Sequence, residues 1–354
     1  MTLHFIAYLF IIQKTCYLNY IISHKLSVAP MLDWTDRHCR YFYRLMSAHT
    51  VLYTEMVTTG AILHGKGDYL SYNNVEHPLV LQLGGSDVKA MTECAKIAEQ
   101  YGYDEININV GCPSDRVQNG RFGACLMAEP SLVADCVNEM QAATKVPVTV
   151  KSRIGIDDLD SYEFLHTFIE QVAQAGCQHF IIHARKAWLS GLSPKQNRDI
   201  PPLDYDRVYQ IKQDFSALEI SINGGIKTFA EANNHLQHLD GVMIGREIYN
   251  SPYMLAAADQ QIYGVEKDVI SRTEVINLMA DYVDAYVSST LEQGNAYRNP
   301  RAWHILRHML GLCNGLAGAR QFRRYLSESA RKGNANGNTL KQAFAKVTTL
   351  NELV

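Results

Sequence analysis

Residues 219–247 read EISINGGIKTFAEANNHLQHLDGVMIGRE and contain two short β-rich runs with a helical stretch between them. The β-rich runs are 219–225 and 241–247. Over 229–239 apolar residues return every three or four positions, which is the spacing of a helix with one buried face. Thr228 stands where its hydroxyl can accept a hydrogen bond from the first helical turn. This order predicts a β–α–β unit with two parallel strands.

The same alternation extends from this unit back toward the N-terminus. Eight β-rich runs are expected to be strands: 26–31, 51–57, 78–85, 105–111, 147–155, 179–185, 219–225 and 241–247. Helices are expected between them, with Ser86-Asp87, Ser131 and Ser161 as further caps. Eight such units favour an α/β fold of the closed (β/α)8 TIM barrel type over an open doubly wound sheet. No Gly-x-Gly-x-x-Gly follows the first run, which argues against a Rossmann domain for a nicotinamide cofactor.

After the eighth run the strand signals stop, and helices are expected at 269–291, 302–312, 321–331 and 340–347. We therefore expect three parts: an uncertain N-terminal extension (1–24), a catalytic barrel (25–258) and a C-terminal α-helical domain (259–354). The apolar run from Phe5 to Ile12 is much shorter than the ~20 residues of a membrane span, so membrane insertion is not expected. A dispensable extension, a transit peptide and a membrane-surface anchor stay open.

The composition is that of an ordinary globular protein, with 47% hydrophobic and 19% charged residues among 354. The formal net charge of −3 gives no global basic character, so a nucleic-acid surface would have to be a local patch. The eight cysteines form no Cys-x-x-Cys pair, and a chain of this size does not need a disulfide framework. We therefore expect free thiols and a cytoplasmic location.

A local basic patch is present in the predicted helical domain. Residues 298–332 contain eight Lys or Arg side chains and a single acidic one, Glu328. Aromatic and His rings are interleaved with the arginines: Tyr297, Trp303, His304, His308, Phe322 and Tyr325. A charge run is often only a solvated face, and rings at helical spacing also occur in ordinary cores. The one-sided charge together with the rings nevertheless suits an RNA surface, where cations contact phosphates and rings stack on bases.

Barrels of this kind carry their active sites at the carboxyl ends of the strands. The predicted ends are Pro30-Met31, Glu55-Met56, Gln82, Asn109 with Cys112, Lys151 with Arg153, His183 with Arg185, Asn223-Gly224-Gly225 and Gly245-Arg246. A purely structural barrel could end its strands in small residues and turn formers, so these polar ends favour a ligand-binding mouth. The turns after the last two runs leave backbone amides free for a phosphate, and Arg246 adds a guanidinium. A phosphorylated cofactor is expected.

Two side chains at these ends have alternative interpretations. Lys151 suits either a Schiff-base amine or a fixed cation beside a group that becomes anionic. Gln82 and His183 near a phosphate site suit a planar heterocycle, which favours the fixed cation. Cys112 could simply pack in the core, but the flanking glycine and proline turn it toward the mouth. No base accompanies it locally, and a thiol of reference pKa ~8.5 is mostly neutral at pH 7, so a proton donor is favoured over a nucleophile.

Six segments carry a family resemblance. They are 27–36 (SVAPMLDWTD), 107–114 (NINVGCPS), 180–191 (FIIHARKAWLSG), 221–227 (SINGGIK), 307–312 (RHMLGL) and 318–326 (GARQFRRYL). With these segments the chain resembles the tRNA-dihydrouridine synthase family, most closely its A subfamily, from about residue 26 to near the C-terminus. The resemblance implies a flavoprotein that reduces uridine in tRNA.

The resemblance also implies a role for each matching residue. Those implied to contact FMN are Pro30, Met31, Leu32, Gln82, Lys151, His183, Asn223, Gly224, Gly225, Gly245 and Arg246. Cys112 matches the catalytic proton donor. Those implied to meet tRNA are Asn109, Lys195, Arg198, Arg320 and Arg323, with Arg153 near the uracil. In the implied reaction NADPH reduces FMN, hydride passes from flavin N5 to C6 of uridines 20 and 20a in the D-loop, and Cys112 protonates C5.

The sequence implies neither a metal site nor a stable protein partner. Two other functions stay open. A small-molecule flavin reductase of the dihydroorotate dehydrogenase type could share the barrel and a mobile cysteine, but it leaves the basic helical region unexplained. A non-catalytic RNA-binding protein would keep the barrel as a scaffold, and it predicts that the Cys112→Ala variant loses no function.

Overall fold

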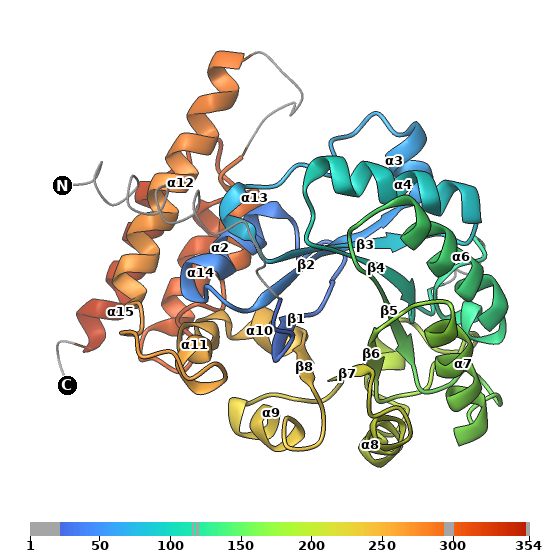
Figure 1. Ribbon diagram of the computed structural model, residues 1–354. Helices are drawn as coiled ribbons and strands as arrows, with labels where there is room; N and C mark the ends of the chain where they lie inside the picture. Colours follow the sequence, from blue (N-terminus) through green and yellow to red (C-terminus); the bar gives the residue numbers. More distant parts are fainter. Residues whose placement is uncertain (1–21, 115–116, 118–119, 294–300, 352–354) are drawn as a thin grey trace.

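The computed structural model describes residues 22–114, 117, 120–293 and 301–351. Eight parallel strands form a closed barrel in chain order, and the last strand pairs with the first (Figure 1). The strands are β1 (Leu26–Val28), β2 (Val51–Thr58), β3 (Leu79–Gly84), β4 (Glu105–Val110), β5 (Val148–Arg153), β6 (His179–His183), β7 (Glu219–Asn223) and β8 (Gly241–Ile244). The predicted TIM barrel is confirmed, and each of the eight predicted runs matches one strand, with β2 ending one residue beyond its run.

Alternating side chains along the strands divide the buried residues into an outer core and a barrel interior. On β4, Ile106 and Ile108 belong to the large core between strands and helices. The intervening Asn107 points inward, where it donates a hydrogen bond to Thr149 of β5. A smaller apolar cluster that includes Tyr53 and Ile181 fills part of the interior. The remaining interior is polar, and its hydrogen bonds link neighbouring strands.

Helices cover the outside of the barrel: α2 (Arg37–Met46), α3 (Thr59–His64), α4 (Val88–Tyr101), α6 (Pro130–Ala143), α7 (Tyr162–Gln174), α8 (Tyr205–Asp214), α9 (Phe229–His235) and α10 (Arg246–Asn250). Asp87, Ser161 and Thr228 cap α4, α7 and α9 through their side chains, as predicted. The predicted cap at Ser131 is wrong. Helix α6 already begins at Pro130, whose fixed φ and missing N–H suit the first helical position.

The chain after the barrel is helical, with α11 (Ala258–Gln261), α12 (Arg272–Gln293), α13 (Trp303–Leu306), α14 (Ala319–Ser329) and α15 (Gly337–Asn351). Helix α15 packs against both α12 and α14, at the side of the barrel (Figure 1). The predicted helix over 302–312 is wrong in its extent, because α13 gives way to a single 3-10 turn, Arg307–Met309. The chain then docks on the end of α10, where Asn314 donates to the Asn250 carbonyl at 2.6 Å.

Aromatic contacts attach these helices to the barrel. The Tyr282 ring on α12 stacks on Tyr41 of α2 with centroids 4.0 Å apart, and the Arg272 guanidinium lies 3.6 Å from the centre of the Tyr253 ring. Among the described residues, no helix is both long and apolar enough to cross a membrane. Most of the predicted extension, residues 1–21, lies outside the described residues.

Candidate active site

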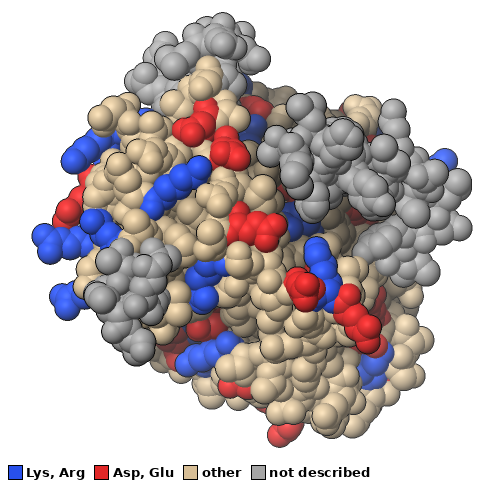
Figure 2. All heavy atoms as spheres, turned by 90° about the vertical axis from the view of Figure 1, so that its left-hand side faces the viewer, with Lys and Arg blue, Asp and Glu red and all other residues tan. Residues whose placement is uncertain are grey.

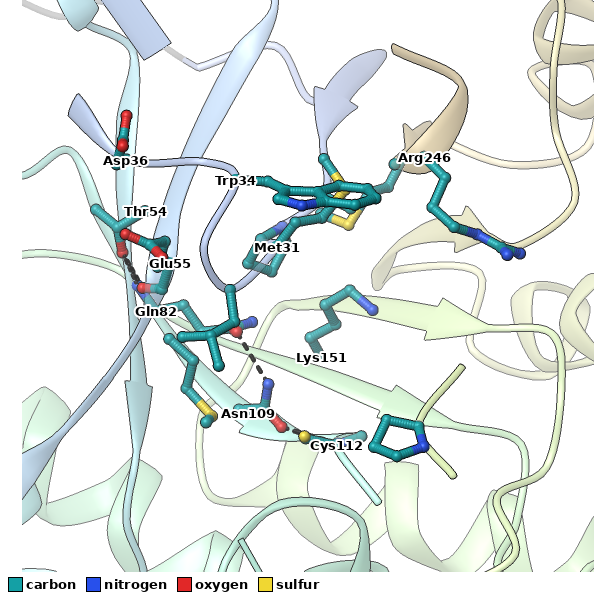
Figure 3. Close-up of a pocket in the computed structure, with 18 of the residues that line it drawn as sticks. Met31, Trp34, Asp36, Thr54, Glu55, Gln82, Asn109, Cys112, Lys151 and Arg246 are labelled. Atoms are coloured by element: carbon teal, nitrogen blue, oxygen red, sulfur yellow. Dashed lines mark hydrogen bonds between the residues drawn. The ribbon is translucent and has the colours of Figure 1, made fainter. Parts of the chain in front are cut away.

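A cavity of about 1350 Å³ opens at the carboxyl ends of the barrel strands, and its wall contains residues of β2 to β8 and of the loop that follows β1. The structure brings most of the predicted site residues together here. The wall contains Pro30, Met31, Leu32, Gln82, Asn109, Cys112, Lys151, Arg153, His183, Arg198, Asn223, Gly224, Gly225, Gly245 and Arg246. Residues that are far apart in sequence therefore share one chamber (Figure 3).

Three predicted tRNA residues lie outside the wall of this cavity. Lys195 is exposed and follows Pro194, which does line the cavity, so the residue lies near the rim. Arg320 and Arg323 are exposed on α14, one helical turn apart. The structure therefore separates the predicted RNA contacts into a group at the cavity and a group on the C-terminal helices.

The turn after β7 requires glycine at two successive positions. Gly224 and Gly225 have φ values of +115° and +77°, which are unfavourable for residues with a Cβ. A Cβ on Gly224 would lie 2.6 Å from the His183 ring, and one on Gly225 would lie 2.5 Å from Leu203. The backbone amides of these two glycines donate to no acceptor in the described part of the chain. The turn thus forms a narrow recess in the cavity with free amide donors.

Arg246, at the start of α10, holds a carboxylate in this structure. Its guanidinium forms an ion pair with Asp199 at 2.7 Å and donates to the Arg198 carbonyl at 3.3 Å. The pair is about half exposed on both sides, so solvent weakens it. An anion that reached Arg246 would compete with the Asp199 carboxylate.

A chain of hydrogen bonds crosses the barrel interior and ends at the Cys112 loop. Gln82 donates to Asn107 at 2.8 Å and accepts from Asn109 at 2.9 Å. The Asn109 carbonyl oxygen then accepts from the backbone amide of Gly111 at 3.1 Å. It also accepts from the amide of Cys112 at 3.0 Å (Figure 3). Because both ends of the Asn109 amide are used, its orientation is fixed, and it ties the loop to β3 and β4.

Arg153 supports the same loop from the other side. Its Nε donates to the Gly111 carbonyl at 3.1 Å, and one terminal nitrogen donates to the Asn197 carbonyl at 3.0 Å. The guanidinium is buried, and burial lowers the pKa of Arg153 to about 10. The Cys112 thiol is partly exposed in the cavity, 3.6 Å from the Ser114 hydroxyl. The described cysteines, Cys112 included, are free thiols, as predicted.

Lys151 points across the cavity toward β7, where its Nζ donates to Asn223 Oδ1 at 3.2 Å. Burial lowers the pKa of Lys151 to about 7, and the nearby Arg153 adds to this effect. Burial also holds the pKa of His183 well below its usual range, again with help from neighbouring cations, so this imidazole is neutral. The site thus combines a lysine that loses its proton readily near neutral pH with a neutral imidazole that can donate or accept a hydrogen bond.

Several residues of the wall carried no role in the sequence interpretation, and two of them make strong contacts. Glu55, on β2, accepts from the Asp33 amide at 2.5 Å, and burial raises the pKa of its carboxyl group. Trp34 stacks on Tyr249 with ring centroids 4.1 Å apart. Glu55 stood at a predicted strand end, which was a usable signal. Nothing in the sequence pairs Trp34 with Tyr249.

Asp36 links the cavity wall to the C-terminal helices. Its carboxylate accepts from Arg307 at 2.7 Å and from His308 at 3.1 Å, and it also caps α2 through the amides of His38 and Cys39. Burial raises the pKa of Asp36, but the hydrogen bond and charge of His308 outweigh it and hold the pKa well below its usual range. Asp36 and Arg307 are 271 positions apart in the chain, and no local sequence pattern predicts their contact.

The predicted basic patch is only partly an open cationic surface. Arg307 is engaged by Asp36, Arg324 pairs with Glu328 at 3.0 Å, and Arg331 lies over the Trp303 ring at 4.7 Å. Of the interleaved rings, Phe322 and His308 are buried. Arg298 and Tyr297 lie outside the described residues. Figure 2 shows this side of the molecule with acidic side chains scattered among the basic ones, so the patch is narrower than the charge count suggested.

Comparisons with known proteins agree on one family. A family model described as dihydrouridine synthase (Dus) matches residues 27–349. Curated proteins named tRNA-dihydrouridine(20/20a) synthase are similar over most of both chains. The Vibrio cholerae protein is 62% identical over 92% of this chain and 97% of its own, and the Escherichia coli protein is 61% identical over 92% of each. The Shewanella oneidensis protein is 62% identical over 93% of this chain and 95% of its own.

A solved structure shares the fold at much lower sequence similarity. The 2-naphthoyl-CoA reductase in complex with 2-naphthoyl-CoA superposes with a TM-score of 0.53 and 10% identity over 72% of this chain. This chain spans about half of that reductase, 52% of its length. At this identity the likeness concerns the barrel fold alone.

Proposed function

Because this chain belongs to the dihydrouridine synthase family, we propose that it reduces uridine in tRNA to dihydrouridine. The observation that carries the proposal is the single cavity that contains Cys112, Lys151 and the glycine turn after β7. Its relatives are named for positions 20 and 20a of tRNA, so we propose these two uridines as the targets. The proposed protein class is an NAD(P)H-dependent flavin oxidoreductase.

The cavity fits FMN in its volume and in its donors. The free amides and tight backbone of Gly224 and Gly225 suit a phosphate, and Gln82 and Lys151 suit the polar edge of the flavin ring system. The cavity of about 1350 Å³ exceeds the roughly 300–1,000 Å³ usual for one small ligand, which leaves room for a base beside the cofactor. When bound, FMN would supply the hydride, and we propose NADPH as the electron source.

The other proposed FMN contacts surround these groups. They are Pro30, Met31, Leu32, His183, Asn223, Gly245 and Arg246. Lys151 would place a positive charge beside the reacting rings, where negative charge develops during reduction, and Asn223 would hold its Nζ in position. Arg246 would exchange the Asp199 carboxylate for the phosphate.

Cys112 would give its Sγ proton to C5 of the uracil. The loop that carries it is held by Asn109 and Arg153, which fixes the direction from which the thiol reaches the base. The sulfur would be left as a thiolate, and the Ser114 hydroxyl, 3.6 Å away, can rotate to donate a hydrogen bond to it. Asn109 and Arg153 would meet the base from these fixed positions.

The proposed tRNA surface has two parts. Lys195 and Arg198 lie at the rim of the cavity and would meet the backbone next to the target base. Arg320 and Arg323 on α14 would hold a more distant part of the tRNA by contacts to phosphates. The target base must leave its stack in order to reach the bottom of the cavity, and backbone contacts on both sides would hold the RNA during that movement.

The test is a reaction of the purified full-length chain with FMN, NADPH and unmodified tRNA, followed by position-resolved nucleoside analysis. We expect dihydrouridine at positions 20 and 20a and none from free uridine. The Cys112→Ala variant should lose at least about 100-fold in rate, within the range for a positioned acid. Cys125→Ala, which changes a free cysteine outside the cavity wall, should retain the wild-type rate.

Two results would contradict this function. Protein that takes up no flavin would exclude the flavin reductase, and equal rates for Cys112→Ala and wild type would exclude the acid role of Cys112. Reduction of free uracil derivatives but not of tRNA would instead support a small-molecule flavin reductase.

A further inference from the structure

The amino-terminal end of the barrel, opposite the cavity, contains a second cluster of ionisable side chains. His24 precedes β1, while Glu105, His179 and Glu219 are the first residues of β4, β6 and β7. The strands of the closed barrel are parallel (Figure 1), so their first residues share one end of it. These residues take no part in the proposed reduction.

Three of these residues bring possible metal ligands together. One ligating atom from each of His24, Glu105 and His179 lies within 4.8 Å of the other two. His24 Nε2 is 2.8 Å from Glu105 Oε2, and His179 Nδ1 is 3.9 Å from the same oxygen. Zinc binds His nitrogen and carboxylate oxygen at about 2.0–2.2 Å, so its ligand atoms lie about 3–3.5 Å apart. The two observed distances, 2.8 Å and 3.9 Å, lie just below and just above that range.

The cluster contains a buried nitrogen without a partner. His179 is 4% exposed, and its Nδ1 has no hydrogen-bond partner among the described residues. A buried polar atom without a partner costs about 1–3 kcal/mol, so such atoms are rare. The atom faces the Glu105 carboxylate, which is itself 1% exposed. A metal ion between the two would use this nitrogen as a ligand.

Each of the three residues is also held by a second group through an atom that would not bind the metal. His24 Nδ1 is 2.8 Å from Glu219, and His179 Nε2 is 2.9 Å from the Ser221 hydroxyl. The other oxygen of Glu105 accepts from Thr149 at 2.7 Å. This arrangement is typical of metal sites, where such partners fix the tautomer and the orientation of the ligands.

We propose that His24, Glu105 and His179 form a binding site for a divalent transition-metal ion, best suited to Zn²⁺. Two imidazoles and one carboxylate match the ligands that Zn²⁺ takes, whereas Mg²⁺ and Ca²⁺ prefer sites made of oxygen alone. The charge of the ion would balance the carboxylates of Glu105 and Glu219. The site would be structural, since it ties the segment before β1 to β4 and β6 at the end of the barrel away from the active site.

The sequence did not predict this site. Its ligands lie 81 and 74 positions apart in the chain, and none of them belongs to a short His/Cys motif. The barrel topology alone brings them together.

The test uses the full-length protein without an affinity tag, freed of metal with a chelator and titrated with Co²⁺. We expect one equivalent to bind with visible d–d absorption, and Zn²⁺ to displace it. His179→Gln should weaken binding at least tenfold, and so should His24→Gln. His64→Gln, at an exposed histidine outside the cluster, should bind like the wild type. Zn²⁺ should also raise the Tm of the wild type but not that of His179→Gln.

The proposal is overturned if the wild-type protein binds no Co²⁺ or Zn²⁺ near neutral pH, because the cluster would then hold only a proton on His24 between two carboxylates. It is equally overturned if His179→Gln binds Co²⁺ with the wild-type affinity and spectrum. The wild-type titration decides the question even if a variant does not fold, and circular dichroism reports folding.

Discussion

Lys151 is a residue whose charge near neutral pH depends on its surroundings. Burial lowers its pKa to about 7, so the ammonium form of the metal-free, flavin-free protein dominates below that pH and is lost above it. An anionic flavin binds the charged form better, so the Kd for FMN should rise between pH 7 and pH 9. We expect an increase of about tenfold, the change for 1.4 kcal/mol. Quenching of flavin fluorescence measures this directly.

The Lys151→Met variant separates this charge from other pH effects. It should bind FMN more weakly at pH 7 and show a nearly flat Kd from pH 7 to pH 9, whereas Lys145→Met, at an exposed lysine, should follow the wild type. A steep pH dependence that survives in Lys151→Met would assign the effect to another group.

Gly224 allows a prediction that separates backbone strain at a positive φ from steric overlap of an added Cβ. The Gly224→Ala variant would place a Cβ 2.6 Å from the His183 ring at a φ of +115°, so it should lose FMN binding as well as stability. Gly191→Ala is the matched control, because Gly191 has a φ of +80° but no atom within 4 Å of the added Cβ. Gly191→Ala should lower the free energy of unfolding by about 1–2 kcal/mol and leave the FMN affinity unchanged. If Gly224→Ala and Gly191→Ala bound FMN with equal affinity, the glycine turn would not be part of the cofactor site.

At the scale of elements, two arginines of helix α14 allow a prediction about tRNA binding. Within the described residues no ion pair joins Arg320 or Arg323 to an acidic side chain, whereas Arg324 on the same helix pairs with Glu328. The double variant Arg320→Ala/Arg323→Ala should weaken tRNA binding and reduce the slope of log K against log salt by about two, one for each lost phosphate contact. Filter binding over a salt series measures both.

Lys96→Ala is the control for this pair, since Lys96 lies on α4 of the barrel and pairs with Glu93. It should leave the affinity and the slope unchanged. If the double variant binds tRNA like the wild type, these arginines belong to an ordinary solvated face.

The elements could be predicted well where the sequence pattern is local. Seven of the eight strands lie within the predicted runs, β2 extends one residue beyond its run, and Asp87 caps α4 as predicted, because alternation and capping residues are local signals. The predicted 302–312 helix was too long, because its end depends on docking against Asn250, which sequence periodicity does not contain. The cavity wall was predictable for the same reason as the strands, since barrel topology places the strand ends together.

What could not be predicted rests on contacts between distant segments. Asp36 with Arg307, Trp34 with Tyr249, and Glu105 with two histidines each depend on the closed fold. The count of arginines also overestimated the basic patch, because a sequence does not show which cations are already paired.

For the whole molecule, the contact of Asp36 with Arg307 and His308 predicts how stability depends on pH. The carboxyl pKa is lower in the folded chain than its unfolded value of ~3.9, so the contact contributes fully above about pH 4. That contribution is lost as the pH falls below 4 toward the lowered pKa. Urea unfolding at pH 7 and at low pH should show this loss in the wild type.

The Asp36→Asn and Asp36→Ala variants separate two contributions of Asp36 to stability: its charged contact with the C-terminal segment and its capping of α2. Asparagine also caps helices well, so Asp36→Asn should lose only the charged contact, about 1–3 kcal/mol at pH 7, and show a smaller loss in acid. Asp36→Ala should cost about 1 kcal/mol more through loss of the α2 cap. Glu328→Gln, at an exposed pair, should change stability by less than about 1 kcal/mol. Identical acid sensitivity in Asp36→Asn and wild type would contradict the assignment.

The position of Asp36 has a thermodynamic consequence. It follows the β1 loop that forms part of the cavity wall, and its carboxylate is bound by the segment that leads into α14. A change that tRNA binding produced in that segment would therefore alter the free energy of the β1 loop. By linkage, the factor by which tRNA changes the affinity for the cofactor equals the factor by which the cofactor changes the affinity for tRNA. The Asp36 carboxylate would thus couple the binding of tRNA to the binding of the cofactor.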